Sequence, residues 1–144
     1  MARTALVVGA SGITGSATAA LLEAQGWTVH GLSRSATGQP GVVPVLADLT
    51  DAAATRAALA GLDPDAVFIS TWTRRATEAE NIRVNGAMIR NLLDALGRTD
   101  TPRHVALVTG LKHYLGPFEA YGKGRLPQTP FREEQGRLDV ENFY

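Results

Sequence analysis

Short runs of apolar residues alternate with longer helix-like segments from the start of the chain. The apolar runs have the length and β-branched content of buried strands and lie at Ala5–Val8, Thr28–Leu32, Val42–Ala47, Ala66–Ile69 and Val105–Val108. Apolar spacing predicts helices over Gly12–Gln25, Asp51–Leu59 and Thr77–Leu96. Strands that alternate with helices indicate an α/β fold with a doubly wound parallel sheet, for which we expect the strand order 3-2-1-4-5.

The predicted helices carry start signals and apolar faces. Thr77 and Glu80 have the spacing of a capping box, and either Thr50 or Asp51 can cap the short helix. We expect Leu21 and Leu22 on the apolar side of the first helix. The stripe expected on the long helix is Ile82, Ile89, Leu92, Leu93 and Leu96.

Three glycines mark the turn between the first predicted strand and the first predicted helix. They have the spacing G-x-x-G-x-x-G. Glycines let the backbone turn tightly and approach a pyrophosphate, whose charge then meets the helix N-terminus. The alternative is a tight turn without a ligand. The spacing resembles the short-chain dehydrogenase/reductase superfamily, and the cofactor contacts expected in the turn are Gly9, Ser11, Gly12, Ile13 and Gly15.

The end of the second strand indicates which dinucleotide is bound. An NAD site usually has an acidic residue there, whereas this chain has Ser33, Arg34 and Ser35. A guanidinium and two hydroxyls suit a 2′-phosphate, which favours NADP(H). The alternative is that Arg34 is only a solvated loop charge.

Further cofactor contacts are expected where the other strands end, and they are Asp48, Leu49, Thr71, Val108 and Thr109. Asp48 fits the adenine side of the site and also fits an acid at a helix N-terminus. Trp72 either forms a wall of the pocket or covers the sheet. Asn85 lies on the apolar stripe of the long helix, where it either helps to organise a site or is a core amide bonded to a strand end.

The last third of the chain carries the most specific resemblance. The segment from Thr109 to Glu119 and the closing Asn142-Phe143-Tyr144 resemble the progesterone 5β-reductase/iridoid synthase-like enzymes, an atypical branch of the same superfamily. The Y-x-x-x-K motif of typical members is absent. In the resembled branch the lysine lies in T-G-x-K-H-Y and the tyrosine opens N-F-Y-Y. Lys112 and Tyr144 occupy those positions.

The resemblance implies NADPH-dependent reduction of a C=C bond conjugated to a carbonyl, in an enone or enal. Tyr144 would hydrogen-bond the carbonyl oxygen as negative charge develops, and Lys112 would supply positive charge and lower the pKa of the phenol. Trp72, Tyr114 and Phe118 would shape the substrate pocket. The alternatives are a nucleotide-sugar epimerase or dehydratase of the extended branch, and a non-catalytic NADP(H)-binding redox sensor.

The resemblance also divides the chain and implies that later parts are missing. Residues 1–110 would form the dinucleotide-binding Rossmann core and residues 111–144 an active-site segment that ends at the tyrosine. Later strands and a substrate-binding region would be lacking, which would leave an apolar edge at the fifth strand. We expect a fragment that is inactive alone, with a homodimer partner or a C-terminal half completing it.

Composition excludes several other classes. The 14 basic and 14 acidic residues give a net charge of zero, which offers no electrostatic case for nucleic acid or an anionic membrane. The chain has no cysteine, and its three histidines are scattered without metal-ligand spacing. No apolar run is long enough to span a bilayer and no signal peptide is visible, so the expectation is a cytoplasmic protein without a metal.

Overall fold

A computed structural model of the chain describes residues 2–36, 38–97, 102, 104–110, 114 and 130–135. The chain forms two compact units, Met1–Val108 and Thr109–Tyr144, and each is described by itself. The expected catalytic residues Lys112 and Tyr144, together with Phe118, lie outside the described residues.

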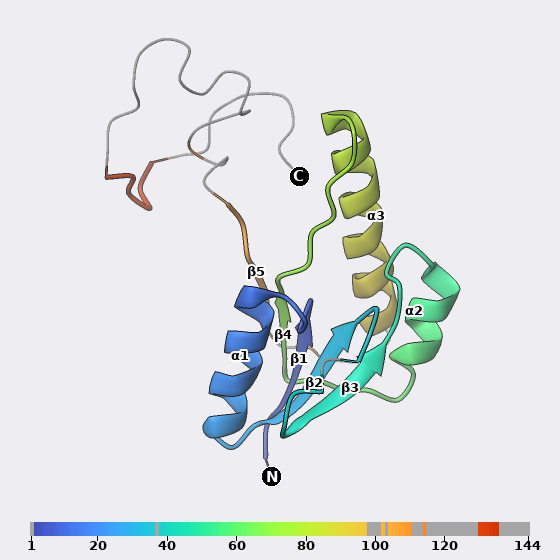
Figure 1. Cartoon of the computed structure of the whole chain (residues 1–144), viewed down its shortest axis with the longest axis vertical. Coiled ribbons are helices and arrows are strands. Elements are labelled where there is room, and N and C mark those ends of the chain that lie inside the picture. Colours follow the sequence, from blue (N-terminus) through green and yellow to red (C-terminus); the bar gives the residue numbers. More distant parts are fainter. Residues whose placement is uncertain are drawn as a thin grey trace. The chain divides into compact units, whose positions relative to one another are not determined.

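A parallel sheet of five strands forms the centre of the first unit (Figure 1). The strands are β1 (Thr4–Val8), β2 (Thr28–Ser33), β3 (Val42–Leu46), β4 (Ala66–Ile69) and β5 (His104–Leu107). Their spatial order is β3-β2-β1-β4-β5, and every neighbouring pair is parallel. The predicted fold class and strand order are therefore confirmed.

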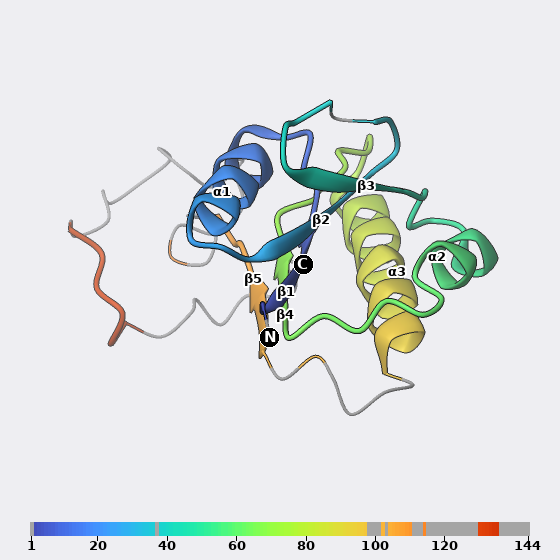
Figure 2. The same cartoon turned by 90° about the horizontal axis from the view of Figure 1, so that it is seen from below.

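Helices cover both faces of the sheet. They are α1 (Ile13–Ala24), α2 (Ala52–Ala58) and α3 (Glu78–Leu96). Figure 2 shows α1 on one face and both α2 and α3 on the other, which is the doubly wound arrangement. Each helix and strand begins and ends within one residue of its predicted bounds. A difference of this size is usual when the end of an element is assigned.

The alternation of side chains along β1 divides the core into two layers. Leu6 and Val8 point to the face that α2 and α3 cover, whereas Ala5 and Val7 point to the face that α1 covers. All four are fully buried. Since parallel strands buried on both faces are nearly all apolar, the short runs in the sequence identified these strands correctly.

Two predicted core positions are wrong. Leu21 of α1 is 60% exposed and Leu93 of α3 is 40% exposed, whereas their neighbours Leu22 and Leu92 are buried. Consecutive residues on a helix are about 100° apart, so a narrow contact with a sheet buries only one of two adjacent leucines. The residues that α3 buries are Asn81, Val84, Asn85, Met88, Leu92 and Leu96.

Strand β5 differs from its partner β4. Val67 and Ile69 of β4 are buried, whereas Val105 and Leu107 of β5 are each about half exposed. All four residues of β5 are exposed. In the described part of the first unit the sheet thus ends on a strand whose apolar side chains are about half exposed.

Candidate functional site

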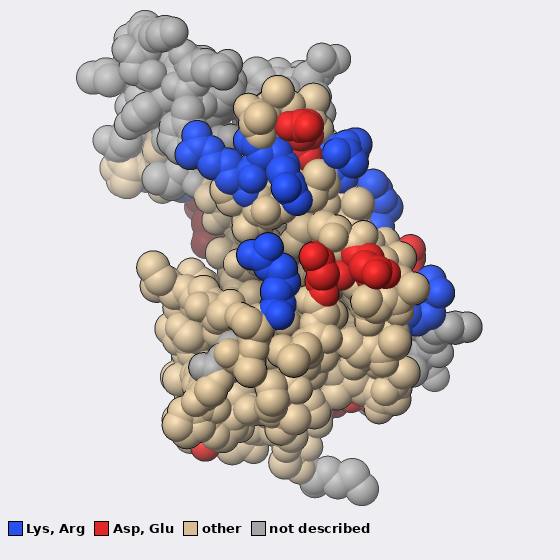
Figure 3. Space-filling view, turned by 45° about the vertical axis from the view of Figure 1, so that its right-hand side comes forward, with Lys and Arg blue, Asp and Glu red and all other residues tan. Residues whose placement is uncertain are grey.

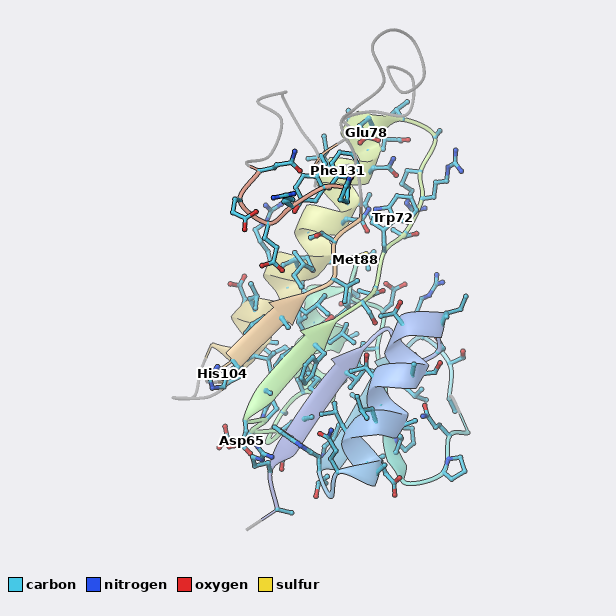
Figure 4. All side chains as sticks on the ribbon, turned by 90° about the vertical axis from the view of Figure 1, so that its left-hand side faces the viewer. Asp65, Trp72, Glu78, Met88, His104 and Phe131 are labelled. Carbon is cyan, nitrogen blue, oxygen red and sulfur yellow. The ribbon has the colours of Figure 1, made fainter. Side chains whose placement is uncertain are left out.

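A cleft lies at the carboxyl ends of β1 to β4, where an open α/β sheet binds its ligands. Figure 4 shows Trp72 on the segment that leaves β4, with Met88 of α3 nearby. The cleft has a volume of about 220 Å³, and residues from the ends of four strands line it. All the lining residues are Gly9, Ser11, Gly12, Leu32, Ser33, Arg34, Ala47, Asp48, Leu49, Thr50, Ser70, Thr71, Trp72, Thr73, Arg75 and Met88.

Two of the three glycines in the β1–α1 turn are required by packing within the protein. Gly9 has a φ of 86°, and a Cβ there would lie 2.9 Å from the backbone nitrogen of Thr71. A Cβ on Gly15 would lie 2.1 Å from the carbonyl oxygen of Gly9. Gly12 is different, because its Cβ would meet only the Gly9 oxygen, at 3.3 Å. Space for a ligand is therefore a better explanation for Gly12 than for Gly9 or Gly15.

The N-terminus of α1 faces this turn without a capping side chain. Gly12 is the N-cap, and the first turn contains no acidic residue. The Gly12 N–H donates to the Gly9 oxygen at 2.9 Å, and among the described residues nothing accepts from the next three N–H groups. Unpaired N–H groups and the helix dipole together attract an anion, so the turn fits the pyrophosphate of a dinucleotide. Ile13 follows the N-cap and is 94% exposed.

The end of β2 presents Arg34 to the cleft. Ser33 is buried, and its hydroxyl donates to the carbonyl oxygen of Ser35. Arg34, between them, is exposed and lines the cleft. The Ser33 hydroxyl proton is thus committed to the backbone, and this serine shapes the turn that carries Arg34. No acidic residue stands at this strand end.

Asp48 follows β3 and is held by the residue two positions later. Its Oδ1 accepts from the Thr50 N–H at 2.9 Å and from the Thr50 hydroxyl at 2.7 Å. These two bonds, with smaller contributions from Arg34 and Arg75 against a small cost of burial, hold the pKa of Asp48 below its usual value. The N-cap of α2 is Asp51, whose side chain accepts from two N–H groups, so of the two predicted caps, Thr50 and Asp51, the structure confirms Asp51.

Asparagines of α3 hold the segment that leaves β4. Asn85 accepts from the Thr73 N–H and donates to the Thr73 carbonyl oxygen, both at 2.9 Å. Its amide also donates to the Asn81 carbonyl oxygen at 2.9 Å. Asn81 in turn accepts from the Arg75 N–H at 2.6 Å and donates to Glu78 at 3.1 Å. Asn85 is thus a satisfied core amide, which was one of its two interpretations from the sequence.

A third asparagine of α3 reaches the neighbouring wall of the cleft. The Asn91 amide donates to the Leu49 carbonyl oxygen at 2.8 Å and so fixes the segment that follows β3. The sequence pattern did not single out Asn81, Asn91 or Arg75 as site residues. The available signal was the four-residue spacing of Asn81 and Asn85, which puts two amides on one face of a helix that otherwise buries apolar residues.

The other expected site residues in the described part of the chain are not among those that line the cleft. Val108 is about half exposed, and its N–H donates to the Ile69 carbonyl oxygen at 2.9 Å. Thr109 and Tyr114 belong to the second unit, where the Tyr114 ring stacks on Phe131 with centroids 5.1 Å apart. Whether these residues contact cofactor or substrate stays a prediction.

The described residues include no group of three or more histidine, cysteine, aspartate or glutamate side chains that could hold a metal ion. Nor does any helix among them have the length and apolar content needed to cross a bilayer. The cleft fits a dinucleotide through the glycine turn, the bare N-terminus of α1 and the guanidinium at the end of β2.

The sequence is similar to curated plant enzymes. An (S)-8-oxocitronellyl enol synthase from Camptotheca acuminata is 38% identical over 151 residues, which cover 97% of this chain and 39% of that protein. A 3-oxo-Delta(4,5)-steroid 5-beta-reductase from Arabidopsis thaliana has the same identity and coverage. The chain thus spans about two-fifths of the length of these relatives, and it is homologous to the progesterone 5β-reductase/iridoid synthase-like enzymes.

Solved structures share the fold of this chain. A short-chain dehydrogenase/reductase superfamily protein from Agrobacterium tumefaciens, with bound NAD, has a TM-score of 0.64 and 29% identity over 78% of this chain and 34% of that one. The aldohexose dehydrogenase of Thermoplasma acidophilum shares the fold, with a TM-score of 0.70 and 16% identity over 83% of this chain and 55% of its own.

The NAD dependent epimerase/dehydratase family matches residues 5–137. The chain therefore belongs to the NAD dependent epimerase/dehydratase family.

Proposed function

We propose that this chain provides the NADP(H)-binding part of an enzyme that reduces an activated C=C bond in an enone or enal. The single observation that carries the cofactor choice is the end of β2, where Arg34 lines the cleft and no carboxylate is present. The homology to enol synthases and a steroid 5β-reductase supports the reaction class.

The preference for NADP(H) over NAD(H) follows from charge. A 2′-phosphate brings negative charge to the end of β2, and a guanidinium binds phosphate through paired hydrogen bonds. An NAD site usually has a carboxylate there for the ribose hydroxyls, and that carboxylate would repel the phosphate. The Agrobacterium relative was solved with NAD. The preference of this chain for one dinucleotide is therefore argued from its own residues and is tested by a binding measurement on this chain.

A nicotinamide dinucleotide held by the glycine turn and by Arg34 would supply a hydride to the β-carbon of the conjugated substrate, and the enolate left behind would take up a proton to complete the reduction of the C=C bond. The protein has to stabilise the negative charge that develops on the carbonyl oxygen. Tyr144 would donate a hydrogen bond to that oxygen, and the Lys112 ammonium would add positive charge and lower the pKa of the phenol, which makes the phenol a stronger donor. These two roles rest on the resemblance of the terminal segment. The described residues contribute the cleft that orients the dinucleotide.

The test is an assay of NADPH oxidation with a panel of enones and enals. Since the relatives are much longer than this chain, the assay uses a chimera that continues it after Tyr144 with the C-terminal region of the Arabidopsis reductase. The chain alone, the chimera, and chimeras with Lys112→Ala or Tyr144→Phe are compared. We expect enone-dependent oxidation by the chimera and at least a tenfold loss in each variant. Wild-type rates in both variants would remove the catalytic assignment.

A second candidate is the epimerase or dehydratase chemistry for which the matching family is described. Neither Tyr114 nor Tyr121 begins the Y-x-x-x-K motif of typical members, because Phe118 and Arg125 stand four residues after them. Incubating the chimera with nucleotide sugars and NAD⁺ distinguishes the two. Conversion of a nucleotide sugar with no enone reduction would favour the second candidate.

A further inference from the structure

The cleft is lined by a second guanidinium from a different segment than Arg34. Arg34 follows β2, whereas Arg75 lies between β4 and α3, and both side chains are exposed. Both act electrostatically on Asp48, which lies in the same cleft after β3. Two cations from separate segments are thus close to one carboxylate. Figure 3 shows a face of the molecule on which basic side chains lie near acidic ones.

The carboxylate of Asp48 leaves the guanidinium groups of both arginines available. Its Oδ1 is occupied by the N–H and hydroxyl of Thr50. Within the described part of the chain, no ion pair shorter than 4 Å joins Asp48 to Arg34 or to Arg75. Both guanidiniums therefore keep their hydrogen-bond donors for a ligand in the cleft.

The backbone that carries Arg75 is anchored at two points. The Arg75 N–H donates to the Asn81 side chain, and Thr73 exchanges two hydrogen bonds with Asn85. Both asparagines are only 7% exposed, so these bonds are shielded from water. The start of the Arg75 side chain is thus fixed before a ligand binds, which lowers the entropy cost of placing the guanidinium on it.

We infer that Arg75 is a second binding residue for the 2′-phosphate of NADP(H), acting together with Arg34. The inference rests on the proposed preference for NADP(H) and adds the residue that strengthens it. Two guanidiniums and one carboxylate leave a net positive charge at this part of the cleft. A 2′-phosphate neutralises that charge, whereas NAD(H) brings its only phosphates to the glycine turn.

The test compares two nucleotides that differ in the 2′-phosphate. The full 144-residue chain is titrated with 2′,5′-ADP and with 5′-AMP by calorimetry, as wild type, Arg75→Gln and Arg74→Gln. Arg74 is a matched control, because it is the adjacent exposed arginine and does not line the cleft. Circular dichroism checks that all three proteins are equally folded.

We expect Arg75→Gln to weaken binding of 2′,5′-ADP about tenfold and to change binding of 5′-AMP less than twofold. Arg74→Gln should leave both affinities within twofold. If Arg75→Gln leaves a clear preference for 2′,5′-ADP intact, or weakens both nucleotides equally, this inference is wrong while the proposed cofactor stands. If the wild type shows no preference for 2′,5′-ADP, the proposed cofactor is wrong and the inference goes with it.

Discussion

The two walls of the cleft are held in place by different forces. The glycine turn is fixed by backbone packing, since a single added carbon on Gly15 would overlap the Gly9 oxygen. The segment after β4 is fixed by the side chains of Asn81 and Asn85, which bond to its backbone. The comparison teaches that glycines alone are weak evidence for a ligand, because two of the three are needed by the fold. We propose that the choice of ligand lies instead with two exposed charges, Arg34 after β2 and Arg75 after β4.

The largest effect is expected from Gly15→Ala. Its Cβ would lie 2.1 Å from the Gly9 oxygen, a backbone atom that cannot move aside like a flexible side chain. We expect a loss of about 3 kcal/mol in the free energy of unfolding, at the upper end for overpacking. Urea denaturation measures it. Gly12→Ala is the matched control and should cost less than about 1 kcal/mol, because only one contact at 3.3 Å is tightened. Equal losses in the two variants would contradict the steric account.

Asn85→Ala tests the opposite wall. The change removes three hydrogen bonds and leaves the half-buried N–H and carbonyl of Thr73 without their partner. We expect a loss of about 2 kcal/mol in stability, since an unsatisfied buried polar group costs roughly 1 to 3 kcal/mol. Thermal denaturation checks it. Asn91→Ala loses one bond and serves as the milder comparison. A neutral Asn85→Ala variant would show that the amide does not hold this wall.

Arg34→Gln tests whether Arg34 sets the preference for NADPH over NADH. The variant should bind NADPH about tenfold more weakly, a change of about 1.4 kcal/mol, because the 2′-phosphate loses a charged partner. Binding of NADH should change less than twofold. Titration of nicotinamide fluorescence measures both affinities. Arg56→Gln, on α2 and away from the cleft, controls for general charge effects. Equal weakening of the two dinucleotides would contradict a role at the 2′-phosphate.

The smallest effect concerns pH. Hydrogen bonds from Thr50 lower the folded pKa of Asp48 below its ordinary value of 3.8, so the ionised form is favoured by folding. The resulting stabilisation is fully present above pH 3.8 and is lost as the pH falls through the lower folded pKa. Comparing unfolding of the wild type and Asp48→Asn between pH 2 and 6 should show a slightly shallower acid dependence in the variant. Identical pH profiles would show that Asp48 makes no such contribution.

Most of the fold could be predicted because its signals are local. Short apolar runs such as Ala66–Ile69, and the glycine spacing, define strands and a turn without knowledge of the tertiary structure. Leu93 could not be placed correctly from its spacing, since its exposure depends on how narrow the contact of α3 with the sheet is. The Asn91 bond to Leu49 joins residues 42 positions apart, and only the fold brings them together. Arg75 lines the cleft for the same reason.

The preference of the chain for NADPH over NADH tests the central claim most directly. Both dinucleotides are titrated into the 144-residue protein at low ionic strength, where charge contributes most to binding. The account predicts that NADPH binds at least tenfold more tightly than NADH. Equal affinities, or tighter binding of NADH, would contradict it.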